Sequence, residues 1–147
     1  MRQRIRRSPR VMLALPLLVA VVAAAEGPGS PSIRSLMHRQ YTVSRAPFKT
    51  IRVQMDAQSP DWEKVQQAGE TFVALAETLA KKTPRHGGEE SWRRFLDEHL
   101  ADARAMADAA VARDPVRLRA AHRRIVASCK SCHEYHRFRP GGGDSPG

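Results

Sequence analysis

The chain has 147 residues, with 25 Lys and Arg against 15 Asp and Glu, and a formal net charge of +10. This length suits one domain. The charge alone would suit a nucleic-acid partner, but the sequence contains no known nucleic-acid-binding motif, so we expect no such partner. It also contains neither the pattern of a catalytic triad nor a pair of catalytic carboxylates, and we expect no enzymatic activity.

The first 25 residues have the pattern of a secretory signal peptide. Arginines crowd the start, no acid precedes Glu26, and an apolar run over 11–25 is broken only by Pro16. The run ends in Ala23-Ala24-Ala25, which fits a cleavage site, and it is shorter than the roughly 20 residues of a membrane-spanning helix. We therefore predict cleavage and export to the periplasm, with an uncleaved anchor as the alternative. Cleavage removes five arginines and lowers the formal charge from +10 to +5.

Apolar residues then recur at helical spacing over four stretches, without a strand pattern. Pro47 should kink or split the first stretch, because proline lacks the backbone N–H that a helix interior needs. Residues 26–139 therefore predict an all-α domain, an antiparallel four-helix bundle. Residues 140–147 contain no apolar side chain and predict a disordered tail. The predicted helix starts are Ser30-Pro31, Ser59-Pro60, Glu89 after a Pro- and Gly-rich loop at 83–88, and Asp114-Pro115.

Both cysteines of the protein lie in one short motif, Cys129-Lys130-Ser131-Cys132-His133. The spacing C-x-x-C-H is typical of c-type haem attachment. On a helix, the two thiols and the imidazole share the inner face, at i, i+3 and i+4. The thiols can add to the two vinyl groups of a porphyrin, and the imidazole is a common ligand of haem iron. We therefore predict one covalently bound haem c, attached through Cys129 and Cys132, with His133 as an iron ligand.

Two other interpretations of the motif remain. A redox disulfide of the thioredoxin type would be expected near a βαβ pattern and at a helix N-terminus, whereas this pair lies late in a helical pattern. A zinc site would need about four ligands, and no second Cys and His pair at regular spacing accompanies the first. Haem attachment is the preferred interpretation, because it also agrees with export.

A four-helix pattern with a late C-x-x-C-H resembles the cytochrome c′ family. The resemblance covers the whole mature chain and implies either electron transfer in the periplasm or, in members with an open distal position, binding of NO or CO. It also implies that Arg137 lies near the proximal face of the haem, where it could meet a propionate; a solvated arginine at a helix C-terminus is the alternative. His122 and His136 depart from the family, which usually has aromatic residues there. The matching residues are Ser128, Cys129, Lys130, Cys132, His133 and Arg137.

The resemblance places the distal iron ligand in the first helix. Low-spin members use a methionine there, usually a few residues after an arginine, and Met37 follows Arg34. Met37 also lies on the apolar stripe that includes Ile33 and Tyr41, where methionine is otherwise a core residue. The alternatives are an open distal site and ligation by His38. A thioether ligand would favour electron transfer over gas binding.

The expected partners are redox proteins, which the sequence does not identify. A modestly basic surface beside an exposed haem edge would steer the protein towards an acidic partner, with association rates that fall as salt rises. Homodimers are common among members of the family that the chain resembles, so a homodimer is a further expectation.

Overall fold

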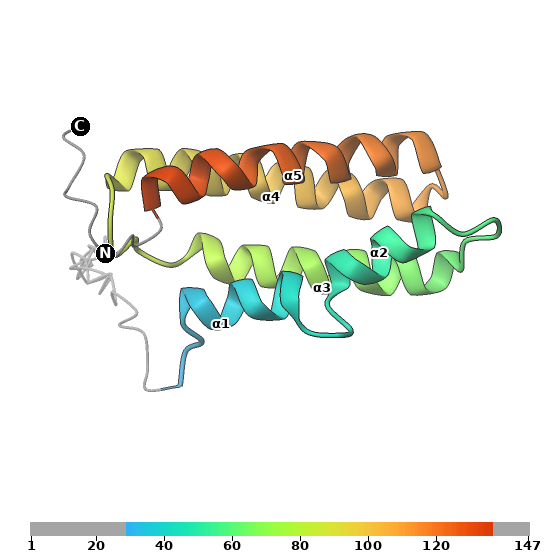
Figure 1. Ribbon diagram of the computed structural model, residues 1–147, viewed down its shortest axis with the longest axis horizontal. Coiled ribbons are helices and arrows are strands. Elements are labelled where there is room, and N and C mark those ends of the chain that lie inside the picture. Colours follow the sequence, from blue (N-terminus) through green and yellow to red (C-terminus); the bar gives the residue numbers. More distant parts are fainter. Residues whose placement is uncertain (1–28, 137–147) are drawn as a thin grey trace, which may run out of the picture. The chain divides into compact units, whose positions relative to one another are not determined.

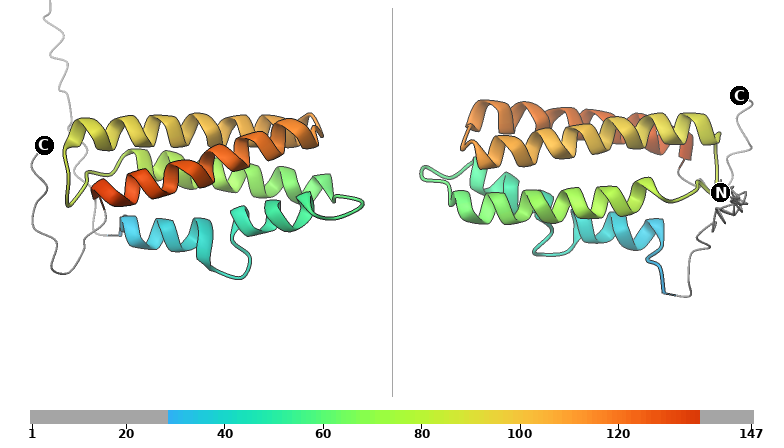
Figure 2. Two further views of the ribbon diagram at one scale, coloured as in Figure 1. Left: turned by 45° about the horizontal axis from the view of Figure 1, so that its top comes forward. Right: turned by 180° about the vertical axis from the view of Figure 1, so that it is seen from behind.

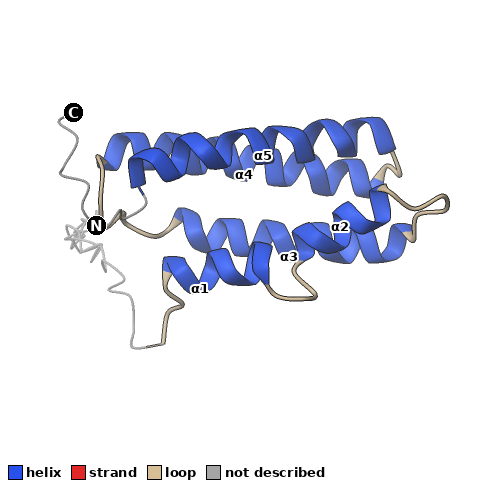
Figure 3. Ribbon diagram, in the orientation of Figure 1, coloured by secondary structure: helices blue, strands red, loops and turns tan. Residues whose placement is uncertain are grey.

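The computed structural model describes residues 29–136, and every regular element in that range is a helix (Figures 1 and 3). The predicted all-α class is confirmed for these residues. The predicted signal peptide at 1–25, Arg137 and the tail at 140–147 lie outside the described residues. All the helices belong to the compact unit that begins at Pro31. They are α1 (Ile33–Met37), the π-helical η1 (His38–Thr42), α2 (Pro47–Met55), α3 (Trp62–Ala80), α4 (Glu89–Val111) and α5 (Pro115–His136).

The helices form four roughly parallel segments that run back and forth (Figures 1 and 2). The first segment consists of α1, η1 and α2, and the other three are α3, α4 and α5. Pro47 splits the first segment as predicted, because it is the first residue of α2, where its missing N–H has no cost. None of the helices within 29–136 is long and apolar enough to cross a membrane.

Two of the predicted helix starts were wrong by two residues. The cap of α1 is Ser32, whose hydroxyl accepts from the Ser35 amide at 3.2 Å, and the cap of α3 is Asp61. In each case a side-chain oxygen beyond the predicted Ser-Pro pair accepts one of the first free amides, which fixes the start of the helix. The prediction at Asp114-Pro115 is confirmed, since the Asp114 carboxylate accepts from two amides of the first turn of α5.

The interior contains two clusters of buried side chains. The larger cluster joins α2, α3, α4 and the first half of α5, and includes Phe72, Met106 and Ile125. The smaller one, here called the leucine–tryptophan cluster, joins α1, α3 and α4 at the opposite end of the bundle. It consists of Leu36, Leu75, Leu79, Trp92 and Leu96.

The first segment approaches α5 at one end only. Residues of α2 have Cα atoms within 8 Å of α5, whereas no Cα atom of α1 or η1 lies that close to α5. Instead, α1 and η1 pack on α3. The backbones therefore diverge from α2 towards α1, and the C-x-x-C-H motif lies in the half of α5 where they are farther apart.

Candidate functional site

The two cysteines lie in the last turns of α5, both half-buried and both free thiols. The Cys129 thiol donates to the carbonyl oxygen of Ile125, with 3.1 Å between Sγ and O. Burial raises the pKa of both thiols, and for Cys132 the neighbouring Cys129 raises it further. A redox-active C-x-x-C pair depends on a lowered thiol pKa, so this setting does not favour the thioredoxin-type interpretation.

One flank of α5 faces the first segment. Near its start, Arg119 donates to the carbonyl oxygen of Met55 at 2.7 Å, and the ring of His122 stacks on Phe48 with 4.2 Å between centroids. Helical spacing continues this stripe through Val126 to His133. Towards the end of α5 the side chains of this stripe are exposed. Val126 has 52% of its surface accessible, and His133 is exposed as well.

His133 is therefore placed differently from the sequence prediction. Its spacing from Cys129 predicted an inward side chain, but the structure exposes it on the flank that α2 covers further up the helix. Among the described residues, the first segment brings its Cα atoms within 8 Å of α5 only at α2, so α1 and η1 do not cover this part of the stripe as closely as α2 covers its start. An imidazole on such a flank is accessible to a flat prosthetic group inserted beside α5.

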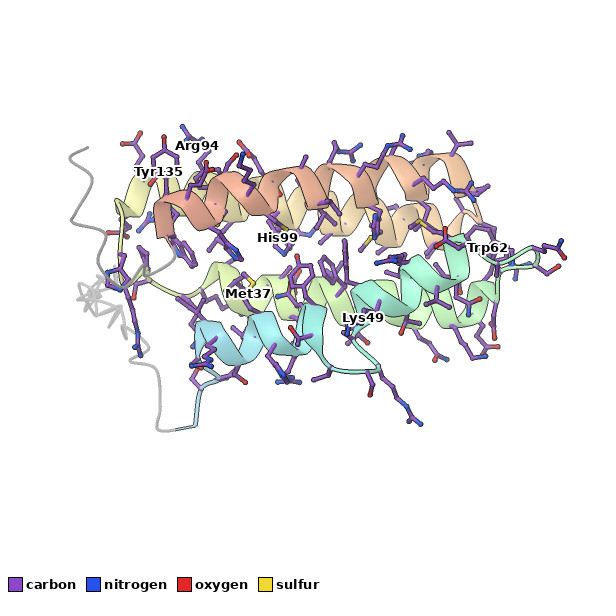
Figure 4. All side chains as sticks on the ribbon, in the orientation of Figure 1. Met37, Lys49, Trp62, Arg94, His99 and Tyr135 are labelled. Carbon is purple, nitrogen blue, oxygen red and sulfur yellow. The ribbon has the colours of Figure 1, made fainter. Side chains whose placement is uncertain are left out.

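Met37 lies on the side of α1 that faces the bundle (Figure 4). It is half-buried and packs against the leucine–tryptophan cluster, and Cys132 packs against that same cluster. His38, by contrast, is exposed. The structure thus brings Met37 and Cys132 to one apolar cluster from two different helices, and it leaves His38 on the outside.

Tyr41 lies one turn beyond Met37 and packs against the larger cluster. Its ring makes edge contacts with Phe48 and Phe72, at 5.0 and 5.6 Å between centroids. Burial, and then the nearby Cys129 and Cys132, raises the pKa of Tyr41 above its usual range. The phenol therefore stays neutral near the cysteines. The sequence placed Tyr41 on an apolar stripe and did not indicate that it lies near them.

The sequence analysis missed a buried polar pair, Gln40 and His99. The His99 Nε2 and the Gln40 Oε1 lie 3.2 Å apart, and Gln40 is fully buried while its Nε2 has no hydrogen-bond partner within the described residues. Burial lowers the pKa of His99 to about 4, outweighing the opposite effect of Asp102. In the sequence, each of these two polar residues lies on an otherwise apolar helical stripe, which could have indicated a buried polar group. Their pairing could not be predicted in this way, because the two positions are 59 residues apart in the chain.

His136 holds the end of α5 against the α3–α4 loop. One ring nitrogen lies 2.9 Å from the carbonyl oxygen of His86, and the other lies 3.2 Å from the hydroxyl of Ser91. Its ring packs edge-on against Trp92, 5.1 Å between centroids. This histidine, three residues beyond His133, therefore fixes the last turn of the helix that carries the motif.

His122 and the motif lie far apart. His122 precedes His133 by 11 residues, about 16 Å along a helix axis, so both cannot bind the same face of one iron. Burial, followed by the charge of Arg52, lowers the pKa of His122, and its Nε2 has no hydrogen-bond partner within the described residues. It packs on Phe48 as a neutral aromatic ring.

The donor set at this end of the bundle fits haem c. Covalent attachment needs two free thiols on one helical face, and the iron takes axial ligands from imidazole or thioether groups. Cys129, Cys132, His133 and Met37 supply these groups from α5 and α1. Between residues 29 and 136, no three His, Cys, Asp or Glu side chains cluster as metal ligands.

No protein-family model, curated protein or solved structure was found to match this chain. Its relation to the cytochrome c′ family therefore stays a prediction from the residues of the motif and the helical pattern.

Proposed function

We propose that this protein is an exported monohaem c-type cytochrome that transfers electrons in the periplasm. The observation that supports it best is that Cys132 and Met37 pack against one apolar cluster, while His133 is exposed on the adjoining flank of α5. A covalent haem beside α5 would cover that flank.

The chain's own residues have distinct tasks in this proposal. Cys129 and Cys132 hold the group covalently, and His133 supplies the proximal ligand. The leucine–tryptophan cluster excludes water from one side, which favours a low local dielectric. Haem iron, when bound, supplies a one-electron couple whose potential depends on its axial ligands and burial. Arg137, four residues after His133 in the sequence, is proposed to meet a propionate.

Met37 is the proposed sixth ligand. It is half-buried at the same cluster as Cys132, whereas His38 is exposed and would need its side chain to enter the bundle. A thioether in the distal position raises the potential and blocks access of small gases. This placement favours electron transfer over the alternative, a five-coordinate haem that binds NO or CO.

Covalent attachment is tested on the protein purified from the periplasm. Haem should remain with the polypeptide on a denaturing gel, and replacing both Cys129 and Cys132 with alanine should abolish that signal. Extraction of the haem into acid acetone from the unaltered protein would show that the attachment proposal is wrong.

The distal ligand is tested by visible spectra of the oxidised and reduced protein, with and without CO. The unaltered protein should be low-spin, show a far-red methionine–iron band and bind no CO. Met37→Ala should lose the band and bind CO, whereas the matched control His38→Ala should leave both properties unchanged. Rapid CO binding by the unaltered protein would reverse the assignment and favour the gas-binding function.

A further inference from the structure

Charge is divided between the two sides of the bundle. The stretch from Pro31 to Met55, which contains α1, η1 and α2, has five Lys and Arg residues and no Asp or Glu. Helices α3 and α4 together have nine Asp and Glu against four Lys and Arg, and α5 has five Lys and Arg against one Glu. The first segment and α5, the helix that contains the C-x-x-C-H motif, are thus basic, whereas α3 and α4 are acidic.

The five basic side chains of the first segment are all exposed. They form what is here called the basic surface. None of them is in an ion pair within residues 29–136, in contrast to Arg104 and Arg124, which pair with Glu77 and Asp102. Their charge is therefore available to a partner. The basic surface consists of Arg34, Arg39, Arg45, Lys49 and Arg52.

A short contact fixes the middle of this surface. The ammonium of Lys49 donates to the carbonyl oxygen of Thr42 at 2.6 Å and so joins α2 to the end of η1 across the intervening turn (Figure 4). Arg45 lies in that turn, between the two joined residues. Lys49 and Arg45 thus lie at a turn whose two ends are joined by a hydrogen bond.

We propose that the basic surface is the docking site for a partner protein with an acidic face, and this inference rests on the proposed electron-transfer function. A partner bound at α1, η1 and α2 would lie beside the flank of α5 where His133 is exposed. The charge division gives the protein a dipole, so that an acidic partner meets the basic side first. Such steering raises association rates by about 10-fold to 1,000-fold at low ionic strength.

The side chains of the first segment favour a protein over a membrane or a nucleic acid. An interfacial membrane helix inserts an apolar face into the membrane. In α1 and α2 the large apolar side chains pack into the bundle, with Val53 as the exposed exception among the described residues. Binding of single-stranded nucleic acid uses accessible aromatic rings, whereas Tyr41 and Phe48 are packed against the core. The basic surface has no apolar or aromatic face beside its charges, so it suits binding to a protein surface rich in carboxylates.

The test uses the haem-loaded protein and fluorescein-labelled poly-L-glutamate as the acidic probe. Binding is measured by fluorescence anisotropy, over a salt series from about 0.01 M to about 0.15 M, across which the Debye length falls from about 30 Å to about 8 Å. The patch variant is Arg39→Glu/Arg45→Glu. The matched control, Lys81→Glu/Arg94→Glu, changes the net charge by the same amount in the α3–α4 loop and on α4. Vesicles with phosphatidylglycerol and a DNA strand are the competing probes.

The patch variant should bind poly-L-glutamate at least about tenfold more weakly, and the control should stay within about twofold of the unaltered protein. Equal loss in both variants would overturn the proposal, because it would show a response to net charge alone. Tighter binding to the vesicles or to DNA than to poly-L-glutamate would also overturn it. Reduction by ascorbate should be unchanged in both variants; failure of that reaction in the unaltered protein would instead contradict the electron-transfer function.

Discussion

Acid should destabilise this protein through His99. The side chain is 8% exposed, its Nε2 contacts Gln40, and burial lowers its pKa from 6.5 to about 4. The folded state therefore binds a proton less readily than the unfolded state. The stability that comes from the neutral imidazole is fully present above pH 6.5 and is lost as pH falls through the interval between the two pKa values.

The size of the effect follows from those two pKa values. The shift corresponds to a full penalty of about 3 kcal/mol, at 1.36 kcal/mol per pKa unit. Between pH 7 and pH 5, integration over the two titrations gives a loss of about 2 kcal/mol in the free energy of unfolding. This is a large fraction of the roughly 5–15 kcal/mol that stabilises a typical domain.

Urea unfolding of the purified protein and of His99→Gln at pH 7 and pH 5 measures this loss. Glutamine does not titrate, and its amide can still reach Gln40, so the pH-dependent loss in the variant should be smaller by about 2 kcal/mol. The carboxylates titrate in both proteins and cancel in the comparison. Equal losses in the two proteins would refute the reasoning. If the variant does not fold, NMR titration of His99 in the unaltered protein decides, and a pKa of 6 or above would refute it.

Three further changes test the packing of the helices and the two ends of α5. Gly69→Val should destabilise the protein by about 1–3 kcal/mol in urea, because a Cβ at Gly69 would already lie 3.1 Å from the Cα of Ala107; unchanged stability would contradict this close approach. Asp114→Ala should cost about 1 kcal/mol by removing the cap of α5, and thermal unfolding measures it. Gly87→Ala should lower the free energy of unfolding by about 1–3 kcal/mol and speed amide hydrogen exchange in the last turn of α5. The reason is that Gly87 has φ +81°, and a Cβ there would lie 2.6 Å from His136 Nδ1. Unaltered exchange would show that the contact of His136 does not hold the end of the helix.

The all-helical class and the break at Pro47 followed from the sequence. These features depend on local physics, since apolar spacing, proline geometry and a capping carboxylate act within one or two turns of the chain. The C-x-x-C-H motif is local in the same sense. Its two thiols and one imidazole lie within five residues, so any helix places Cys129 and Cys132 on nearly the same side.

The tertiary structure determined which neighbours the helical faces contact. Helical periodicity placed His133 inward, but its side chain is exposed, in the half of α5 that α1 and η1 do not approach closely. The apolar stripe favoured Met37 over the adjacent His38, and the structure shows how each is packed: Met37 lies against the leucine–tryptophan cluster, and His38 is exposed. The pairing of Gln40 with His99 was equally hidden. Periodicity defines a direction around one helix axis, whereas burial and pairing depend on the distance and orientation of a second helix, which only the packed bundle specifies.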